Sequence, residues 1–396
     1  MKVYFDNAAT TKVREEAIDA MVRVMRDDYG NPSSTHYAGR YAATVLSGAR
    51  GKIAAALGAM PDEIVFTSGG TESDNLAILG CAGTASHNGK PRSGKHIITS
   101  GIEHDAVLEA TKHLEGLGWD VTYLLPDSSG RVSADSFSGA LRDDTVLASI
   151  MLVNNETGAV NPVNEYAREI KRRRLSTILH TDAVQGFCKI PFTVDTLGAD
   201  LVSVSAHKIH GPKGIGALYI KKGAKLQPML HGGGQEQGKR AGTEAIPAIA
   251  GFGEAAYCAN LERETTYEAA RALERHIFDL VSRELPDAVF LRVGGESPYI
   301  INLSLPGYKS EVLMNALEAD GICVSNSAAC KKGARSRVLE AMGLSDDIID
   351  GALRVSLSRY NTREEAEYFV KALEKAASRL VKIKRNKADG VNAEKR

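Results

Sequence analysis

The fold is decided by a nearly continuous apolar run in the first half of the chain, Thr145-Val146-Leu147-Ala148-Ser149-Ile150-Met151-Leu152-Val153. A strand that is apolar on both faces is typical of a parallel sheet covered by helices on either side. The polar, helix-favouring segment 164–174 comes next, and residues 177–180 then read as another strand. Strands separated by helix-length crossovers predict βαβ units and a largely parallel sheet.

The same alternation of strand-like and helix-like segments surrounds this run. Residues 63–67 and 96–100 are rich in β-forming residues, and each is followed by a stretch with helical spacing. The pattern changes near residue 260, because residues 261–285 read as a long amphipathic helix and the remainder mixes strands with helices. Thr362 and Glu365 form a capping box that predicts the start of the last helix. We therefore expect a large α/β domain followed by a smaller unit.

Composition restricts the classes of protein to which the chain can belong. Its 396 residues include 49 Lys+Arg against 49 Asp+Glu, and 43% are hydrophobic. Zero net charge removes the broad electrostatic argument for a nucleic-acid or anionic-membrane partner. No apolar run approaches the roughly 20 residues that span a bilayer, and the start lacks the apolar region of a signal peptide. Five Cys are too few for a disulfide framework, so we expect a cytoplasmic protein.

Three predicted strand ends carry unusual residues, and ligands collect at the carboxyl ends of parallel strands. Residues 68–72 place small residues at a helix start, which suits a phosphate, although a tight turn with a Thr cap is equally open. Asp182 follows an apolar strand and is either a ligand-binding carboxylate or a helix N-cap. Lys208 lies between apolar strands, where burial would make its amine nucleophilic; a snorkelling surface lysine is the alternative.

One cofactor explains the three strand ends together. Pyridoxal phosphate needs a cradle for its phosphate, a carboxylate facing its pyridine nitrogen, and a lysine that binds its aldehyde. The set, in this order along the chain, predicts a pyridoxal-phosphate enzyme. His207 and His210 have a spacing that metal ligands can adopt, but Lys208 lies between them and no Cys or carboxylates cluster nearby. We therefore expect no metal site.

Further motifs along nearly the whole chain carry a resemblance to a known family. The chain resembles the cysteine desulfurases, which are fold-type I pyridoxal-phosphate enzymes that release sulfur from L-cysteine. The matching segments, in chain order, are residues 4–11, 30–36, 66–73, 103–104, 154–158, 180–185, 205–208, 232–236, 240–244, 327–330 and 353–356. So many ordered motifs are far more specific than any one of them.

The resemblance implies catalytic and substrate-binding roles for matching positions. Lys208 would bind the cofactor covalently and move the α-proton of the substrate. His104 would stack on the cofactor ring and take part in acid–base transfer. Cys330 would attack the substrate sulfur, leaving alanine and an enzyme persulfide. Arg354 would clamp the substrate carboxylate, for which its planar fork is suited, and Asn155 would help to orient the substrate.

The resemblance also implies the contacts of the cofactor. Asp182 would pair with the ring nitrogen, Gln185 would hydrogen-bond the ring oxygen, and Asn155 would help to orient the ring. The phosphate would be held by Gly70, Thr71, Ser205 and His207, joined by Thr243 of the partner subunit in a homodimer.

The implied architecture is a large domain with a mostly parallel seven-stranded sheet flanked by helices, plus a smaller α+β C-terminal domain. Residues 1–15 would pack with the small domain, and residues 16–259 would form the large one. Residues 260–381 would form the small domain and carry the reactive cysteine, and residues 382–396 are a basic tail that we expect to be disordered. The implied function is conversion of L-cysteine to L-alanine, with sulfur passing through Cys330 to an acceptor or iron–sulfur scaffold protein for iron–sulfur cluster or thio-cofactor biosynthesis.

Two alternatives to this function stay open. A selenocysteine lyase or another β-eliminating lyase would share Lys208 and Asp182 without depending on Cys330, and a non-catalytic scaffold would retain only the fold. The segment Ser327-Ala328-Ala329-Cys330-Lys331-Lys332 and residue Ala245 depart from the family pattern.

The cysteines are predicted to play two different roles. Lys331, Lys332 and Arg335 would lower the pKa of the Cys330 thiol. The other cysteines have apolar neighbours and are interpreted as core residues: Cys81, Cys188, Cys258 and Cys323.

Overall fold

The largest sheet has seven strands in the order β2-β8-β7-β6-β5-β3-β4. The computed structural model describes residues 1–86, 95–291, 297–326 and 335–382. Only β8 runs antiparallel to its neighbours, so the predicted mostly parallel seven-stranded sheet is confirmed. The strands are β2 (Ile64–Thr67), β3 (His96–Ser100), β4 (Asp120–Leu124), β5 (Thr145–Ser149), β6 (Ile178–Asp182), β7 (Leu201–Ser205) and β8 (Gly216–Ile220).

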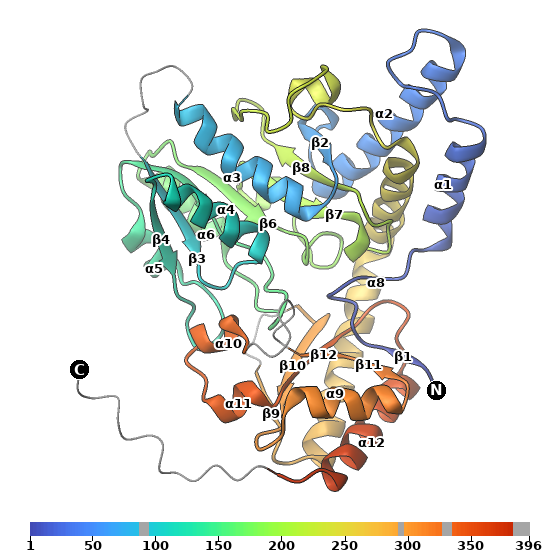
Figure 1. The fold of residues 1–396 in the computed structure, drawn as a ribbon, viewed down its shortest axis with the longest axis vertical. Coiled ribbons are helices and arrows are strands. Elements are labelled where there is room, and N and C mark those ends of the chain that lie inside the picture. The colour runs from blue at the N-terminus through green and yellow to red at the C-terminus, as the bar shows by residue number, and fades with distance from the viewer. Residues whose placement is uncertain (87–94, 292–296, 327–334, 383–396) are drawn as a thin grey trace.

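Helices cover both faces of this sheet (Figure 1). Along β5, Leu147 packs into a cluster with α3 and α4, whereas the next residue, Ala148, packs into the cluster on the other face. This alternation follows from the two-residue period of a strand and explains why the run is apolar throughout. The helices of this part are α1 (Glu15–Arg26), α2 (Tyr37–Leu57), α3 (Gly70–Ser86), α4 (Asp105–Gly116), α5 (Ala134–Ala140), α6 (Val163–Arg172) and α7 (Val194–Leu197).

A second, smaller group of elements, built from the start of the chain and its last third, lies at one end of the molecule (Figure 1). It contains a four-stranded sheet in the order β12-β13-β10-β9 and a two-stranded sheet of β1 with β11. Its strands are β1 (Val3–Tyr4), β9 (Val289–Phe290), β10 (Ile300–Ser304), β11 (Ile322–Cys323), β12 (Ser325–Asn326) and β13 (Ala352–Ser356). Its helices are α9 (Ser310–Ala319), α10 (Arg337–Ala341), α11 (Asp346–Asp350) and α12 (Arg363–Arg379).

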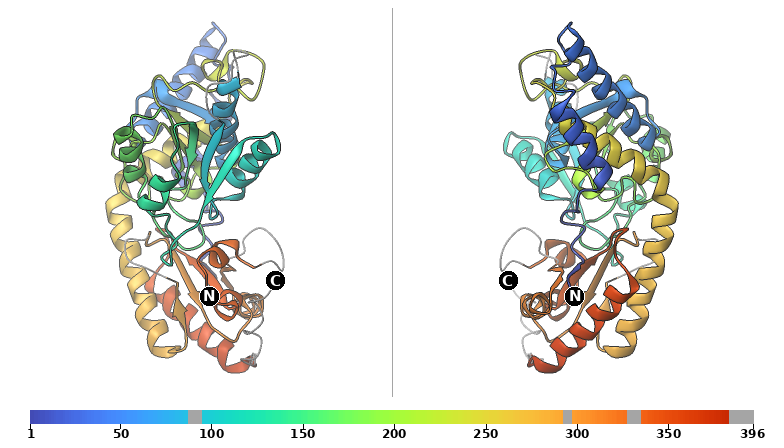
Figure 2. Two further views of the ribbon diagram at one scale, coloured as in Figure 1. Left: turned by 90° about the vertical axis from the view of Figure 1, so that its left-hand side faces the viewer. Right: turned by 90° about the vertical axis from the view of Figure 1, so that its right-hand side faces the viewer.

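One helix, α8 (Ile246–Glu284), belongs to both groups and runs along their common side (Figure 2). Ile249 and Phe252 pack into the core of the large sheet, whereas Ile277 and Val281 pack into the core of the smaller group. The domain boundary expected near residue 260 falls inside this helix, and the domain limits stay a prediction.

Two local predictions have opposite outcomes. The capping box of Thr362 and Glu365 at the start of α12 is confirmed. The burial of Cys323 was predicted wrongly, because Cys323 is exposed on β11 while its neighbour Ile322 faces the core. Cys81 and Cys188 are buried and Cys258 is half-buried. None of the helices in the described ranges is long and apolar enough to cross a membrane.

A buried ion pair fixes the segment that precedes α8. Glu236 is 6% exposed and accepts two hydrogen bonds from the Arg50 guanidinium, at 2.7 and 2.8 Å. The same carboxylate accepts the Phe66 backbone N–H of β2 at 2.9 Å. One side chain therefore ties the short turn η3 (Gln235–Gly238) to both α2 and the edge of the large sheet.

Glu236→Gln is expected to lower the free energy of unfolding by about 3 kcal/mol, because it leaves the largely buried Arg50 guanidinium without its counter-charge. Urea denaturation of the apoprotein measures this change. The matched control is Glu109→Gln, which removes the exposed pair with Lys112 and is expected to cost about 0.5 kcal/mol or less. Equal losses in the two variants would contradict the structural role of Glu236.

Candidate active site

A cavity of about 380 Å³ opens at the carboxyl ends of the central strands, next to the smaller group of elements. Its volume lies in the range of small-molecule sites. The structure brings together every cofactor- and substrate-binding residue predicted within one chain, and adds five others. The lining residues are Ala8, Ala9, Gly70, Thr71, Asp74, His104, Met151, Asn155, Asp182, Val184, Gln185, Ser205, His207, Lys208 and Arg354.

Two of the predicted residues are not among the described residues that line this cavity. Thr243 is exposed and does not line the cavity of its own chain. Cys330 lies in residues 327–334, outside the described residues, as does the tail from residue 383. Arg335, which was expected to act on the Cys330 thiol, is paired with Asp346 and Asp350.

One end of the cavity is suited to an anion. Helix α3 begins at Gly70, so its first backbone N–H groups and the positive end of its dipole lie at the cavity. A Cβ atom at Gly70 would lie 2.9 Å from Val184 Cγ2, so only glycine fits this close approach. Ser205 is 1% exposed, and its Oγ has no hydrogen-bond partner among the described residues. Burial lowers the pKa of His207 to about 4, so this side chain is neutral at pH 7.

A buried carboxyl group lies deeper in the cavity. Asp182 ends β6, is 6% exposed, and accepts the Val184 N–H at 2.8 Å. Burial raises the pKa of Asp182, while His104, the Val184 bond and Lys208 act in the opposite direction. A cationic ring nitrogen at this carboxyl group would favour its charged form.

A layer of polar residues supports Asp182 from behind. His180 is fully buried between the Ser149 and Ser203 hydroxyls, at 2.8 and 2.9 Å, and burial lowers its pKa to about 3. Asp74 lies 3.6 Å from His180 Nε2, and burial together with the charge of Asp182 raises its pKa well above the usual value. His180 is therefore neutral at pH 7, and the raised pKa of Asp74 favours the uncharged form of this carboxyl group beside Asp182.

The lysine is presented by a short turn after β7. Lys208 ends the turn η2 (Ala206–Lys208), and its Nζ donates to the backbone carbonyls of Ala8 and Ala9 at 2.6 and 2.8 Å. Lys208 is the only lysine among the described residues that line the cavity. The N-terminal segment thus lies against the amine, and Thr11 holds it there through two hydrogen bonds to the His207 carbonyl.

His104 is held in one orientation at the start of α4. Its Nδ1 accepts the Ala106 N–H at 3.1 Å, so in the neutral ring the proton is on Nε2. Its neighbour Glu103 is buried and accepts bonds from Ser100 Oγ at 2.5 Å and from the Met151 N–H. Burial raises the pKa of Glu103 to about 8. Glu103 therefore ties the backbone beside His104 to the segment that follows β5.

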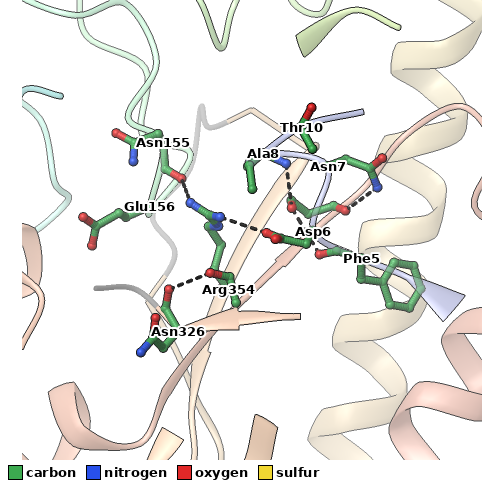
Figure 3. Close-up of polar contacts among 12 residues, drawn as sticks. Phe5, Asp6, Asn7, Ala8, Thr10, Asn155, Glu156, Asn326 and Arg354 are labelled. Carbon is green, nitrogen blue, oxygen red and sulfur yellow. Dashed lines mark hydrogen bonds and ion pairs between the residues drawn. The ribbon is translucent and has the colours of Figure 1, made fainter. Parts of the chain in front are cut away.

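Arg354 of β13 lines the cavity from the smaller group of elements, and Figure 3 shows its polar contacts. The side chain is 2% exposed; one terminal nitrogen donates to Asp6 Oδ1 at 2.9 Å and the other to the Asn155 carbonyl at 3.0 Å. Its Nε is buried without a hydrogen-bond partner in the described part of the chain. The guanidinium thus has more N–H donors than the described residues have acceptors for, and a buried donor group at the edge of a cavity is suited to bind a ligand carboxylate.

The described residues on both sides of 327–334 are anchored near this cavity. Asn326 in β12 is paired with Leu353, the neighbour of Arg354, in β13. Ser336 donates its hydroxyl to the Glu156 carboxylate, and Arg337 donates to the Glu103 carbonyl at 3.0 Å. Burial raises the pKa of Glu156 to about 7. The chain thus leaves and re-enters the described structure next to residues of the site.

The residues present fit pyridoxal phosphate. An unpaired buried hydroxyl and a helix N-terminus lie where its phosphate needs donors, and a carboxyl group and a lysine amine line the same cavity. Sequence reasoning missed Asp6, Ala8, Ala9 and Asp74 as parts of the site. Residues 4–11 were noted only as a motif, and the contribution of Ala8 and Ala9 is made by backbone carbonyls, which residue type does not signal.

Comparison with known proteins agrees with this site. A family model described as aminotransferase class-V matches residues 3–369. Fold, cavity and match together define the chain as a pyridoxal-phosphate enzyme of the class-V aminotransferase family.

Individual relatives narrow the family further. The cysteine desulfurase IscS of Dictyoglomus turgidum is 44% identical over 384 residues, covering 96% of this chain and 95% of the relative. The cysteine desulfurase IscS of Methanosarcina thermophila is 42% identical, with 96% and 92% covered. A solved structure described as a NifS-like protein has a TM-score of 0.88 and 41% identity, and covers 96% of this chain and 100% of its own. The chain belongs to the cysteine desulfurase family.

Proposed function

We propose that the protein converts L-cysteine to L-alanine and transfers the sulfur to its own Cys330. The observation that carries this proposal is the convergence of Lys208, Asp182 and Arg354 on one cavity in a chain of this family. The cavity supplies an amine, a carboxyl group for the ring nitrogen, and a guanidinium for the substrate carboxylate. These are the three charged groups that cofactor and amino acid together require.

Each residue has a defined task in this proposal. Pyridoxal phosphate, when bound, withdraws electrons from the substrate α-carbon. Lys208 Nζ binds the cofactor and moves the α-proton, while Arg354 and Asn155 hold the substrate. His104 Nε2 carries the proton for acid–base transfer, because Nδ1 is engaged by the Ala106 N–H. The remaining cofactor contacts are proposed for Gly70, Thr71, Asn155, Asp182, Gln185, Ser205 and His207.

Cys330 provides the sulfur acceptor in this proposal. Its thiolate attacks the substrate sulfur, the C–S bond breaks, and the carbon side takes up a proton to become alanine while sulfur stays as a persulfide. No external oxidant or reductant is needed, because the electron pair of the broken C–S bond stays with the carbon, which is reduced as the sulfur is oxidised to the persulfide level. The anchoring of Asn326 and Ser336 beside the cavity supports this assignment.

Product analysis separates this function from a β-eliminating lyase. With L-cysteine and a thiol reductant, the holoenzyme is expected to form alanine and sulfide in equal amounts. Pyruvate and ammonia in place of alanine would identify β-elimination. Selenocysteine turnover that does not depend on Cys330 would favour the selenocysteine lyase alternative.

Arg354→Lys is expected to raise KM for L-cysteine about 10- to 100-fold, because a lysine cannot reproduce two charge-assisted bonds in the planar fork. The cofactor absorption spectrum is expected to stay unchanged. Arg359→Lys is the matched control, since Arg359 pairs with Glu262 and does not line the cavity. An unchanged KM in Arg354→Lys would contradict the carboxylate clamp.

We further propose a homodimer in which each site receives Thr243 from the other chain. Thr243 is exposed, and it is absent from the lining of its own cavity. Large apolar side chains are also exposed on α1, on α2 and in the segment that joins them, which favours an interface there. They are Met25, Tyr29, Tyr37 and Tyr41, exposed by 55%, 74%, 67% and 59%.

A mixed dimer tests the contribution of Thr243 in trans. One chain carries Lys208→Ala and the other carries Thr243→Val. If Thr243 acts in trans, the site of the Lys208→Ala chain has both substitutions, and the site of the other chain has neither. The mixed dimer is then expected to bind pyridoxal phosphate at its intact site with wild-type affinity. Affinity as weak as that of the Thr243→Val homodimer would place Thr243 in its own chain's site, and a monomer would exclude the arrangement.

We propose that an acceptor or scaffold protein takes the persulfide sulfur for iron–sulfur cluster or thio-cofactor synthesis. Because the Cys330 thiol must stay free, we also propose a reducing compartment such as the cytoplasm.

A further inference from the structure

A buried lysine lies directly behind Gln185. Lys189 is 8% exposed and follows Cys188, whose backbone is left-handed with φ 55°. This conformation is uncommon for a residue with a side chain, and such strain concentrates at functional sites. The turn directs Lys189 inward rather than toward solvent, and its Nζ lies 5.9 Å from the centre of the Tyr299 ring.

The Lys189 ammonium has one hydrogen-bond acceptor among the described residues. Its Nζ donates to Gln185 Oε1 at 3.3 Å. The carboxylate that lines the same internal cavity, Glu262, is already paired with Arg14 and Arg359. Burial, with the charges of Lys208 and Arg354, lowers the pKa of Lys189 to about 7. The structural contribution of the buried Lys189 amine therefore comes from its hydrogen bond to Gln185 Oε1.

That bond, together with a bond to the Ala8 carbonyl, determines which way the Gln185 amide faces. Gln185 Nε2 donates to the Ala8 carbonyl at 2.9 Å, while Oε1 accepts from Lys189. In its ammonium form Lys189 has no acceptor, and the Ala8 carbonyl has no donor. Rotating the amide by half a turn would therefore place N–H against N–H and oxygen against oxygen. The second N–H of Nε2 is the donor that remains for a ligand in the cavity.

We infer that Lys189 is a positioning residue that fixes the Gln185 amide so that an N–H, and not the oxygen, faces the ring oxygen of the cofactor. This inference rests on the proposed contact between Gln185 and the cofactor. With the oxygen facing inward, two electron-rich atoms would meet and the bond would be lost. Lys189 itself does not touch the cavity that receives the cofactor.

The test is a double-mutant cycle read by cofactor affinity of the apoprotein and by the absorption spectrum of the bound cofactor. Gln185→Ala is expected to weaken affinity about five- to tenfold, the value of one hydrogen bond, and to shift absorption toward the form with a protonated ring oxygen. Lys189→Met keeps the length of the side chain and removes the donor. It is expected to reproduce both changes, and to add less than about twofold in the Gln185→Ala background.

Two further variants keep the test decisive. Lys189→Arg retains a donor and is expected to restore the wild-type spectrum, whereas the control Lys222→Met removes an exposed lysine and is expected to change nothing. Misfolding is not expected in Lys189→Met, because removing a buried charge relieves its desolvation.

The outcomes separate this inference from the function on which it rests. A Gln185→Ala protein with unchanged spectrum and affinity would overturn the proposed contact of Gln185, and the inference with it. A changed Gln185→Ala protein beside an unchanged Lys189→Met protein would overturn the inference alone. Equal effects of Lys189→Met in the wild-type and Gln185→Ala proteins would also overturn the inference alone, because the lysine would then act independently of the Gln185 amide.

Discussion

Lys208→Ala is expected to lower the rate of alanine formation by at least about 10⁴-fold, the upper end of the contribution of one positioned acid–base group. The reason is that one amine both binds the cofactor and moves the α-proton. No other lysine among the described residues lines the cavity, so no neighbouring amine can replace Lys208. Steady-state alanine formation measures the loss.

Two observations make the Lys208 result specific. Borohydride reduction of the holoenzyme is expected to attach the cofactor permanently to wild-type protein and not to Lys208→Ala. The control Lys213→Ala alters an exposed lysine five residues further on and is expected to keep near-normal turnover. Substantial turnover by Lys208→Ala would show that the amine has been assigned wrongly.

Cys330→Ala is expected to reduce alanine formation from L-cysteine by roughly 10³-fold or more, since no other group takes the sulfur once the nucleophile is gone. Substrate binding should survive, because Arg354 and Asn155 are untouched. Addition of L-cysteine should therefore still change the absorption of the bound cofactor, and rapid mixing with quantification of alanine separates binding from sulfur transfer.

Cys323 offers a matched control for this variant. It is exposed on β11, seven residues before Cys330, and β11 pairs with β1 outside the cavity. Cys323→Ala is expected to retain wild-type activity. Unimpaired turnover by Cys330→Ala, or an equal loss in Cys323→Ala, would refute transfer through Cys330.

The large sheet could be predicted because its strands are buried on both faces. β5 is largely apolar for this reason, β6 begins with Ile178 and Leu179, and the helix α6 between them keeps a regular period. The start of α8 was missed, since the structure begins this helix at Ile246 and not at Leu261. Gly251 and Gly253 weaken the helical signal there. Both are required by close packing, because a Cβ atom would lie 2.7 Å from Met21 or Ala49.

The predicted site residues came together because charged and small residues at strand ends are unusual, as at Asp182 and Lys208. The supporting residues could not be predicted in the same way. Lys208 is held by the carbonyls of Ala8 and Ala9, and the contacts of Arg354 with Asp6 depend on a parallel bridge between Asp6 and Ser356. Such pairings join the two ends of the chain, and no local pattern encodes them.

The burial of Cys323 was predicted wrongly for a related reason. β11 contains only two residues, so side chains alternate between core and solvent within a run that is apolar in sequence. The position of Cys323 on the solvent side of β11 depends on the pairing of this strand with β1.

The central claim is that sulfur leaves L-cysteine as a persulfide on Cys330 while alanine is formed. A single turnover tests it most directly: holoenzyme is mixed with equimolar L-cysteine without reductant, and alanine and the mass of the Cys330 peptide are measured. We predict one alanine per active site and one added sulfur atom on Cys330. Alanine without bound sulfur, pyruvate in place of alanine, or sulfur on another cysteine would contradict the account.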